Sequence, residues 1–343
     1  MRSMKKLLFV SMLAAGVVGL ACAGGCAKDG NAPIRLSYSV FFPPTHVHAQ
    51  LAASWAAEVE KRSGGRLKIS VYPGATLTKA DQCWAGVVDG ISDLGMSCLA
   101  YTPGPFPLLE ALDLPLKWPD GEVATAVSAE LAEKYAAESA LPAKLLYLHA
   151  HGPGVLATRQ KVENLEDLQR LKIRGTGLSA QIVEALGGTA IGMSQPDTYD
   201  ALQKGVVDGT FCPIETLKGW RQGECVKYVL EVPEVGYTTA MFVAMNRKKW
   251  DSLPPDLQQI LLDTSAEWLP KHGKAWCDAD DEGRAFAAEK GVEFLRLPPD
   301  EAARWAEKVA PLLDAYVARC EAKGLPGRAF LTDAQEAIKA SGK

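Results

Sequence analysis

The 343-residue sequence contains eight cysteines but no two of them at C-x-x-C spacing. Thiols at that spacing hold structural zinc or form thioredoxin-type redox sites, so we expect neither kind of site. Beyond residue 26 the cysteines are widely separated, at Cys83, Cys98, Cys212, Cys225, Cys277 and Cys320. Because these spacings favour no particular pairing, we expect most of the six to be small buried side chains.

Clusters of lysine and arginine are also missing, and the formal net charge is −4 at pH 7. A protein that binds nucleic acid through its phosphates needs a concentrated basic surface, so nucleic acid is excluded as a partner. Hydrophobic residues make up 48% of the chain and charged residues 23%. This composition and length are typical of a globular protein with two domains.

Motifs of the common enzyme classes are absent. The chain has no G-x-S-x-G, no G-x-x-x-x-G-K-[ST], no H-E-x-x-H and no G-x-G-x-x-G opening a helix, so we expect no catalytic residue and no cofactor. His46 and His48 would point apart on a helix, and no third ligand lies near them in the sequence, so no metal site is expected. The acidic residues Asp278, Asp280 and Asp281 are typical of a solvated helix face.

The chain has one long hydrophobic run, from Leu7 to Ala21, which follows three basic residues among the first six positions. The run is too short for a comfortable membrane span of about 20 residues, and no basic flank follows it. We therefore predict that residues 1–26 form a secretory signal peptide and that the mature protein is periplasmic.

Two cysteines near the end of this signal follow small residues, which is typical of bacterial lipoproteins. Cys22 and Cys26 are each a candidate for the lipidated first residue of the mature chain. Ordinary cleavage near Ala27 is the alternative. The mature protein is thus expected to be soluble or anchored to a membrane by lipid.

Alternating apolar residues predict strands over residues 34–41 and 67–71. Between them, Leu51, Trp55 and Val59 recur every fourth residue, which predicts an amphipathic helix. This strand–helix–strand unit indicates a parallel sheet, and similar units recur between residues 145 and 211, so the fold class is α/β. Residues 254–291 are predicted to form a helix of about 35 residues, which at about 50 Å is long enough to cross two lobes. Residues 299–324 are predicted to form a further helix.

Arg174 ends a predicted buried strand and is followed directly by Gly175-Thr176-Gly177 and a helix. Ligands of open α/β folds bind at such strand ends. A guanidinium there binds a carboxylate through two parallel hydrogen bonds, and the N–H groups at the helix start add donors. The competing interpretation is a structural ion pair.

Several segments together resemble the substrate-binding proteins of tripartite ATP-independent periplasmic (TRAP) transporters, across nearly the whole mature chain. No single segment is decisive, but their order and spacing match the family. The matching segments are residues 55–73, 74–77, 89–95, 164–174, 199–209 with Pro213, and 253–262.

The resemblance implies a periplasmic binding protein of the Venus-flytrap type, with two α/β lobes, hinge strands and a long helix that spans both lobes. Lobe I is expected over residues 33–152 plus about 240–280, and lobe II over 153–239 plus about 281–330. It also implies a monomer without catalytic activity, which delivers a small organic acid to the membrane subunits of a TRAP permease.

In the family, the strand-end arginine corresponding to Arg174 usually binds a ligand carboxylate. Many members have a second arginine where this chain has Gly154, and Glu-Asn where it has Phe211-Cys212. A single clamp in an aromatic wall predicts a monocarboxylate with an apolar or aromatic body. With Arg174, the expected ligand contacts are Phe41, Phe42, His46, Cys98, Tyr101, Thr176, Gln195, Phe211 and Cys212.

Three alternatives stay open at the level of sequence. The protein could bind a polar or cationic molecule, with Arg174 held in an ion pair by a carboxylate such as Glu215. An exported α/β enzyme, for instance a hydrolase, belongs to a different class, but no nucleophile motif supports it. A sensor subunit that presents its ligand to a receptor kinase would have the same sequence features as a transport protein.

Overall fold

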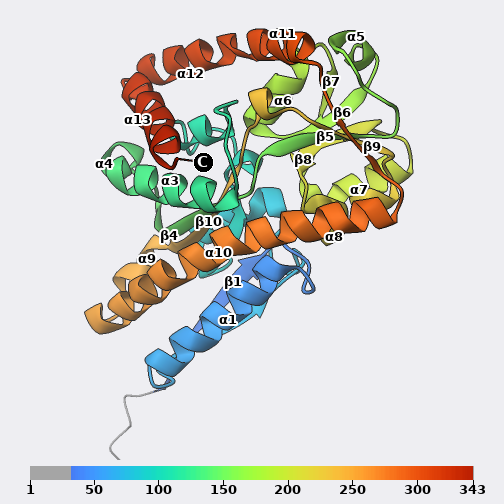
Figure 1. The fold of residues 1–343 in the computed structure, drawn as a ribbon. Coiled ribbons are helices and arrows are strands. Elements are labelled where there is room, and N and C mark those ends of the chain that lie inside the picture. Colours follow the sequence, from blue (N-terminus) through green and yellow to red (C-terminus); the bar gives the residue numbers. More distant parts are fainter. Residues whose placement is uncertain (1–31, 343) are drawn as a thin grey trace, which may run out of the picture. The chain divides into compact units, whose positions relative to one another are not determined.

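The computed structural model describes residues 32–342, so the predicted signal peptide with Cys22 and Cys26 lies outside the described residues. The described part contains two mixed β-sheets with helices packed around them (Figure 1). Within residues 32–342, no helix combines the length and the apolar character needed to cross a membrane. The predicted α/β class and the two-sheet architecture are confirmed.

The first sheet has five strands in the order β2-β1-β3-β10-β4. β1 lies parallel to β2 and β3, and β10 runs antiparallel between β3 and β4. The predicted strand–helix–strand unit is present, with helix α1 (Val47–Arg62) between β1 and β2. The strands are β1 (Ile34–Val40), β2 (Leu67–Tyr72), β3 (Leu94–Cys98), β4 (Ala143–Ala150) and β10 (Ala240–Asn246).

The second sheet has six strands in the order β11-β9-β5-β8-β6-β7. β6 lies parallel to β7 and β8, whereas β5 is antiparallel to β8 and β9. The carboxyl end of β6 therefore lies beside β7 and β8. The strands are β5 (Gly154–Thr158), β6 (Lys172–Gly175), β7 (Thr189–Gly192), β8 (Gly209–Pro213), β9 (Tyr228–Glu231) and β11 (Glu293–Arg296).

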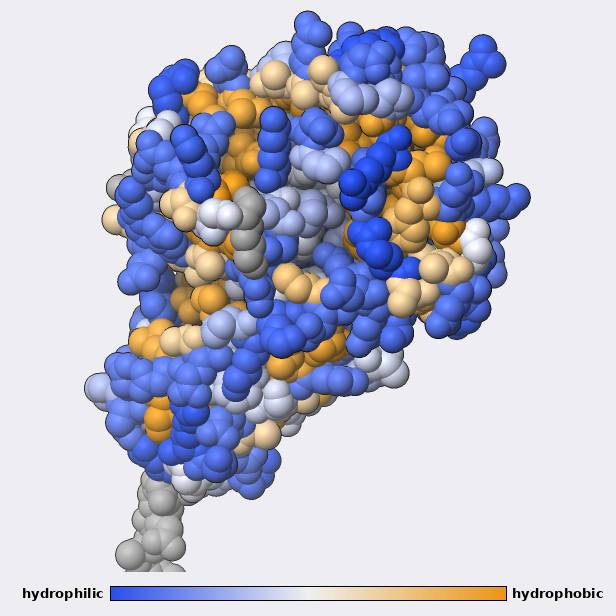
Figure 2. Space-filling view, in the orientation of Figure 1, coloured by the Kyte–Doolittle hydropathy of each residue, from blue (hydrophilic) through white to orange (hydrophobic). Residues whose placement is uncertain are grey.

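The remaining helices cover these sheets, and the face drawn in Figure 2 is largely hydrophilic with smaller hydrophobic areas. One helix was expected over residues 299–324, but the chain forms two, because Pro311 cannot continue the first and starts the second. The division into lobes at the stated boundaries stays a prediction. The helices are α2 (Cys83–Asp89), α3 (Gly121–Lys134), α4 (Ala136–Ser139), α5 (Leu165–Leu168), α6 (Gly177–Ala185), α7 (Gln195–Gln203), α8 (Thr216–Gly219), α9 (Arg247–Asp251), α10 (Pro255–Glu289), α11 (Pro299–Val309), α12 (Pro311–Glu321) and α13 (Gly327–Ala340).

Helix α10 is the predicted long helix, with 35 residues, and it contacts elements of both sheets (Figure 1). Two of its glycines mark the close contacts. A Cβ atom added at Gly273 would lie 3.2 Å from the Cα of Glu122 on α3, and one at Gly283 would lie 2.5 Å from the carbonyl oxygen of Ile214, which follows β8. The absence of side chains at these positions allows one rigid helix to pack directly against both halves of the described chain.

Replacing Gly283 with alanine should lower the free energy of unfolding by about 1 to 3 kcal/mol, although alanine favours a helix by about 1 kcal/mol over glycine. The reason is the overlap of the new Cβ with the backbone of Ile214. Urea denaturation measures the effect. Glu282→Ala, at an exposed position of the same turn, serves as the control and should change stability by less than about 0.5 kcal/mol. Equal stability of the two variants would contradict the close contact.

Three histidines from α1, β4 and α10 form a buried stack beside the first sheet. The rings of His149 and His272 lie 4.1 Å apart at 17°, and those of His48 and His272 lie 5.0 Å apart at 10°. Nδ1 of His48 is 2.8 Å from Nδ1 of His272, and the Trp276 Nε1–H donates to Nδ1 of His149 at 3.0 Å.

Sequence inspection found no third possible ligand beside His46 and His48, whereas the fold brings nitrogens of His48, His149 and His272 within 4.8 Å of one another. The Nδ1 atoms of His48 and His272 face each other at 2.8 Å, which fits a hydrogen bond between one protonated and one unprotonated nitrogen. The three rings therefore form a hydrogen-bonded aromatic stack.

Burial lowers the pKa of His272 to about 3 and also holds the pKa values of His48 and His149 well below 6.5. These rings stay neutral in the folded chain but take up protons near pH 6.5 when unfolded. The unfolded state thus binds more protons at acidic pH, so this contribution to stability is complete above about pH 6.5 and is lost as the pH falls toward 3.

The free energy of unfolding should therefore fall less steeply between pH 6 and 4 in His272→Gln than in the parent. The slope should be smaller by about 1.4 kcal/mol per pH unit. Thermal or urea unfolding across this pH range measures the slope. Asp113 and Asp280 have raised pKa values and act in the opposite direction. They are present in both proteins, so the difference between the two slopes isolates the histidine. Parallel slopes would show that His272 is not a buried neutral base.

Candidate functional site

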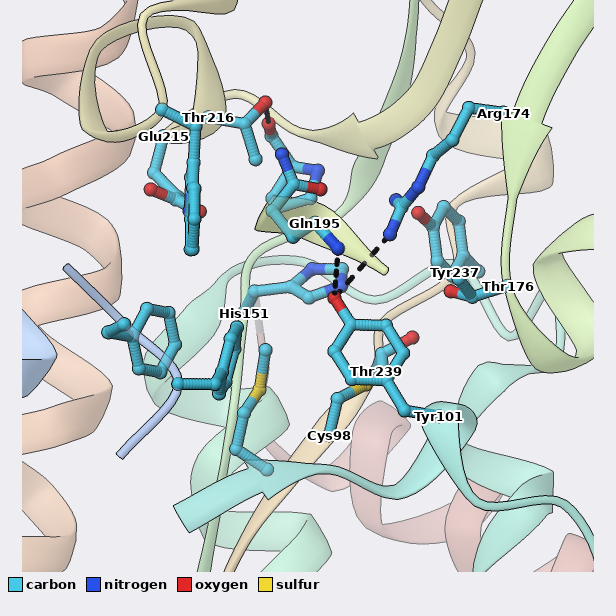
Figure 3. Close-up of a pocket in the computed structure, with 15 residues that line it drawn as sticks. Cys98, Tyr101, His151, Arg174, Thr176, Gln195, Glu215, Thr216, Tyr237 and Thr239 are labelled. Atoms are coloured by element: carbon cyan, nitrogen blue, oxygen red, sulfur yellow. Dashed lines mark hydrogen bonds between the residues drawn. The ribbon is translucent and has the colours of Figure 1, made fainter. Parts of the chain in front are cut away.

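A small cavity lies where the ends of strands from the two sheets meet (Figure 3). Seven of the ten predicted contact residues line it: Phe41, Phe42, Cys98, Tyr101, Arg174, Thr176 and Gln195. The first four come from the ends of β1 and β3, and the other three follow or end β6 and β7. The fold thus brings together residues more than 150 positions apart in the sequence.

The other three predicted residues lie behind this lining. His46 stacks on Phe42 with ring centroids 4.4 Å apart. Phe211 stacks on Tyr237 at 4.7 Å, and the sulfur of Cys212 accepts a hydrogen bond from the Thr216 hydroxyl at 3.1 Å. These side chains support the wall of the cavity rather than form it.

Arg174 supplies a buried positive charge to the cavity, with 3% of the residue exposed. Its Nε donates to the carbonyl oxygen of Met193 at 3.0 Å, and its Nη2 lies 3.5 Å from the hydroxyl of Tyr101. No carboxylate within residues 32–342 forms an ion pair with it. A guanidinium remains charged at any physiological pH, so a cavity built around this one favours an anion.

The alternative partner for Arg174, Glu215, is engaged elsewhere. Its Oε2 lies 3.0 Å from Nε2 of His46, and both side chains are almost fully buried. The Glu215 N–H donates to Oδ1 of Asp280 at 2.8 Å. Asp280 was expected on a solvated helix face, but it is partly buried, and desolvation raises its pKa to about 7.

Tyr101 connects the two sheets across the cavity. Its hydroxyl accepts a hydrogen bond from the N–H of Gln195 at 3.0 Å, in addition to its contact with Arg174 (Figure 3). Burial raises the pKa of Tyr101, and burial also raises that of the Cys98 thiol beside it. Both groups are therefore neutral, and Arg174 dominates the electrostatics at this end of the cavity.

The ring of Tyr237 fills the space next to Gly154. A Cβ added at Gly154 would lie only 1.8 Å from Cε1 of the Tyr237 ring, whose hydroxyl donates to the carbonyl oxygen of Phe211 at 2.9 Å. A larger residue at position 154 is incompatible with this ring. The cavity therefore has an aromatic ring beside Gly154, the position at which the family resemblance implies a second arginine in many members.

Sequence reasoning missed eight lining residues, which come from loops, from the end of β8, from the start of α8 and from β10. Trp220 is the most prominent, because its ring stacks on Phe41 at 6.0 Å and 15°. No local pattern marks such residues, since only the tertiary fold brings them to the cavity. They are His151, Pro213, Glu215, Thr216, Trp220, Tyr237, Thr239 and Met241.

The cavity has a volume of about 30 Å³. That is room for water, whereas a cavity of about 150 Å³ is needed to hold benzene. An organic ligand can therefore enter only if lining side chains or the two sheets move apart.

Comparison with known proteins identifies relatives of the same architecture. Residues 38–319 match the family model of bacterial extracellular solute-binding protein, family 7. A TRAP solute-binding protein from Rhodoferax ferrireducens, solved with copurified benzoate, is 30% identical, with 90% of this chain and 98% of that chain covered and a TM-score of 0.83.

Two further relatives have different stated ligands. A marine metagenome TRAP solute-binding protein specific for aromatic acid ligands, solved with metahydroxyphenylacetate, is 28% identical, covers 90% of this chain and 100% of that chain, and has a TM-score of 0.84. The C4-dicarboxylate-binding periplasmic protein DctP of Rhodobacter capsulatus is 28% identical over 300 residues, covering 85% of this chain and 89% of the relative. Since similar folds take ligands of different charge, the ligand class must be inferred from the residues of this site.

Proposed function

This chain belongs to the bacterial extracellular solute-binding proteins of family 7, the binding components of TRAP transporters, and we propose that its ligand is a small aromatic or apolar monocarboxylate. It is a binding protein and not an enzyme. The observation that carries the proposal is Arg174, a buried guanidinium in an aromatic cavity with no carboxylate partner among the described residues. A ligand carboxylate supplies the missing negative charge through two parallel hydrogen bonds.

The surrounding side chains favour an apolar or aromatic ligand body. Phe41, Phe42 and Trp220 form one wall, with Phe41 stacked on Trp220 and Phe42 tilted toward both. Rings of this kind pack well against an aromatic ligand. The ring of Tyr237 lies beside Gly154, the position at which the family resemblance implies a second arginine in many members, and this supports one carboxylate rather than two.

The transport role follows from the family. The protein binds its acid outside the cytoplasmic membrane and delivers it to the membrane subunits of a TRAP permease. The two lobes open to admit the ligand and close around it, with α10 as the element common to both. Gene neighbours that encode a small and a large permease subunit would favour transport over a sensor role.

We also propose that the mature chain is periplasmic and begins near residue 22, 26 or 27, with lipid on Cys22 or Cys26 in the first two cases. Mass spectrometry of the native protein distinguishes these starts. An intact Met1 would contradict export through the predicted signal peptide.

Arg174→Ala should weaken the binding of benzoate or phenylacetate by about 30-fold to several thousand-fold, since loss of a buried charge-assisted clamp costs about 2 to 5 kcal/mol. Isothermal titration calorimetry measures the affinity, and a thermal-shift screen of aromatic acids, branched-chain acids, sugar acids, dicarboxylates and amines identifies the best ligand first.

Arg170→Ala is the matched control, because Arg170 is an exposed arginine of the same segment. This variant should bind like the parent. If Arg174→Ala binds the acid as tightly as the parent, or if only amines bind, the carboxylate clamp is wrong. The alternative function, a receptor for a polar or cationic molecule, would then be favoured.

A further inference from the structure

The end of the cavity away from Arg174 is also polar. Glu215 and Arg174 lie on opposite sides of the Tyr101 hydroxyl and Gln195 (Figure 3). Glu215 lines the cavity although only 2% of the residue is exposed, and Oε2 is held by His46 at 3.0 Å. His46 bonds only to Oε2 of Glu215. Within residues 32–342, no hydrogen bond is formed to Oε1, so this oxygen can still accept one.

The backbone is shaped around this hydrogen bond between His46 and Glu215. A Cβ added at Gly219 would lie 2.6 Å from Oε2 of Glu215 and 2.9 Å from Nε2 of His46. The Glu215 N–H is fixed by Asp280 at 2.8 Å. His46 thus holds the carboxylate of Glu215, and Asp280 holds its backbone.

Two buried donors of the same lining lack partners. Nε2 of Gln195 and Nε1 of Trp220 are inaccessible to solvent and form no hydrogen bond with the described residues. Trp220 directly follows Gly219, and its ring lies 5.8 Å from that of His46. The lining thus contains both an acceptor, Glu215, and two unpaired donors.

An unpaired buried donor is costly, so a ligand group that pairs with it gains affinity. A hydroxyl both donates and accepts, so it can donate to Glu215 and accept from one of the unpaired donors of the lining. A second carboxylate only accepts, and it would face the negative charge of Glu215. A bare aromatic ring leaves the donors unpaired.

We propose that Glu215 is the specificity residue of this site, which selects monocarboxylates with a hydroxyl group far from the carboxylate and rejects dicarboxylates. This inference rests on the proposed function, because it takes Arg174 as the carboxylate clamp. The ligand class is thus a hydroxylated aromatic monocarboxylate.

The test compares ligands that share one ring and differ in one substituent: benzoate, 3- and 4-hydroxybenzoate, isophthalate and terephthalate. Calorimetry on the parent protein should show the better hydroxybenzoate binding about tenfold more tightly than benzoate, and the dicarboxylates on the order of 100-fold more weakly. Glu215→Gln removes the charge and keeps the shape. It should improve dicarboxylate binding relative to benzoate by at least about tenfold.

Two further variants complete the design. Trp220→Phe keeps an aromatic ring beside Phe41 but removes the N–H. It should reduce the preference for hydroxybenzoate without improving the binding of dicarboxylates. This variant also tests the inference if Glu215→Gln does not fold. Glu336→Gln removes an exposed charge on α13 and should leave every ratio unchanged.

The outcomes separate this inference from the proposed function. If benzoate binds but the dicarboxylates bind equally well, or if neither variant alters the ratios, Glu215 is not the specificity residue and the carboxylate clamp stands. If none of the aromatic acids binds to the parent, this inference is overturned, and the proposed function then depends on whether the thermal-shift screen finds binding of a branched-chain acid.

Discussion

The candidate site depends on a cation that the described protein does not neutralise. Arg174 is placed at the end of β6, where backbone pairing with β7 and β8 fixes its Cα, and the Met193 carbonyl orients its Nε. Glu215, the carboxylate of the same cavity lining, is hydrogen-bonded to His46 instead. A buried charge without a partner is unfavourable. A bound anion therefore compensates the charge of Arg174 and stabilises the site.

Much of the architecture could be predicted from sequence because it depends on local patterns. The alternation in β1 and β2, the fourfold spacing in α1 and the length of α10 all match the observed elements closely. The predicted helix boundaries were less accurate where a proline ends one helix and begins the next. The chain after Pro299 forms two helices rather than one, since Pro311 interrupts the hydrogen-bond ladder.

The site could be predicted only in part, for a physical reason. Arg174 was recognised because a strand end followed by a glycine-rich turn is a local signal. Tyr237 was not, since the only trace of it in the sequence is Gly154, whose missing side chain is explained by a ring 83 residues away. The same holds for the histidine stack, which assembles three residues from α1, β4 and α10. Long-range packing of this kind has no periodicity to detect.

The small cavity and the Tyr101 contacts indicate that a ligand competes with Tyr101 for hydrogen bonds to Arg174 and Gln195. Tyr101 belongs to the first sheet, and its hydroxyl occupies hydrogen-bonding positions on Arg174 and Gln195 of the second. A carboxylate that approaches Arg174 must take over part of this bonding while the lining moves to make room. The hydroxyl is already a good acceptor, so the net gain from a neutral polar ligand is small. An anion gains much more, because it adds a charge interaction that the neutral phenol of Tyr101 does not provide. Selectivity for acids therefore arises from this competition as well as from the presence of the arginine.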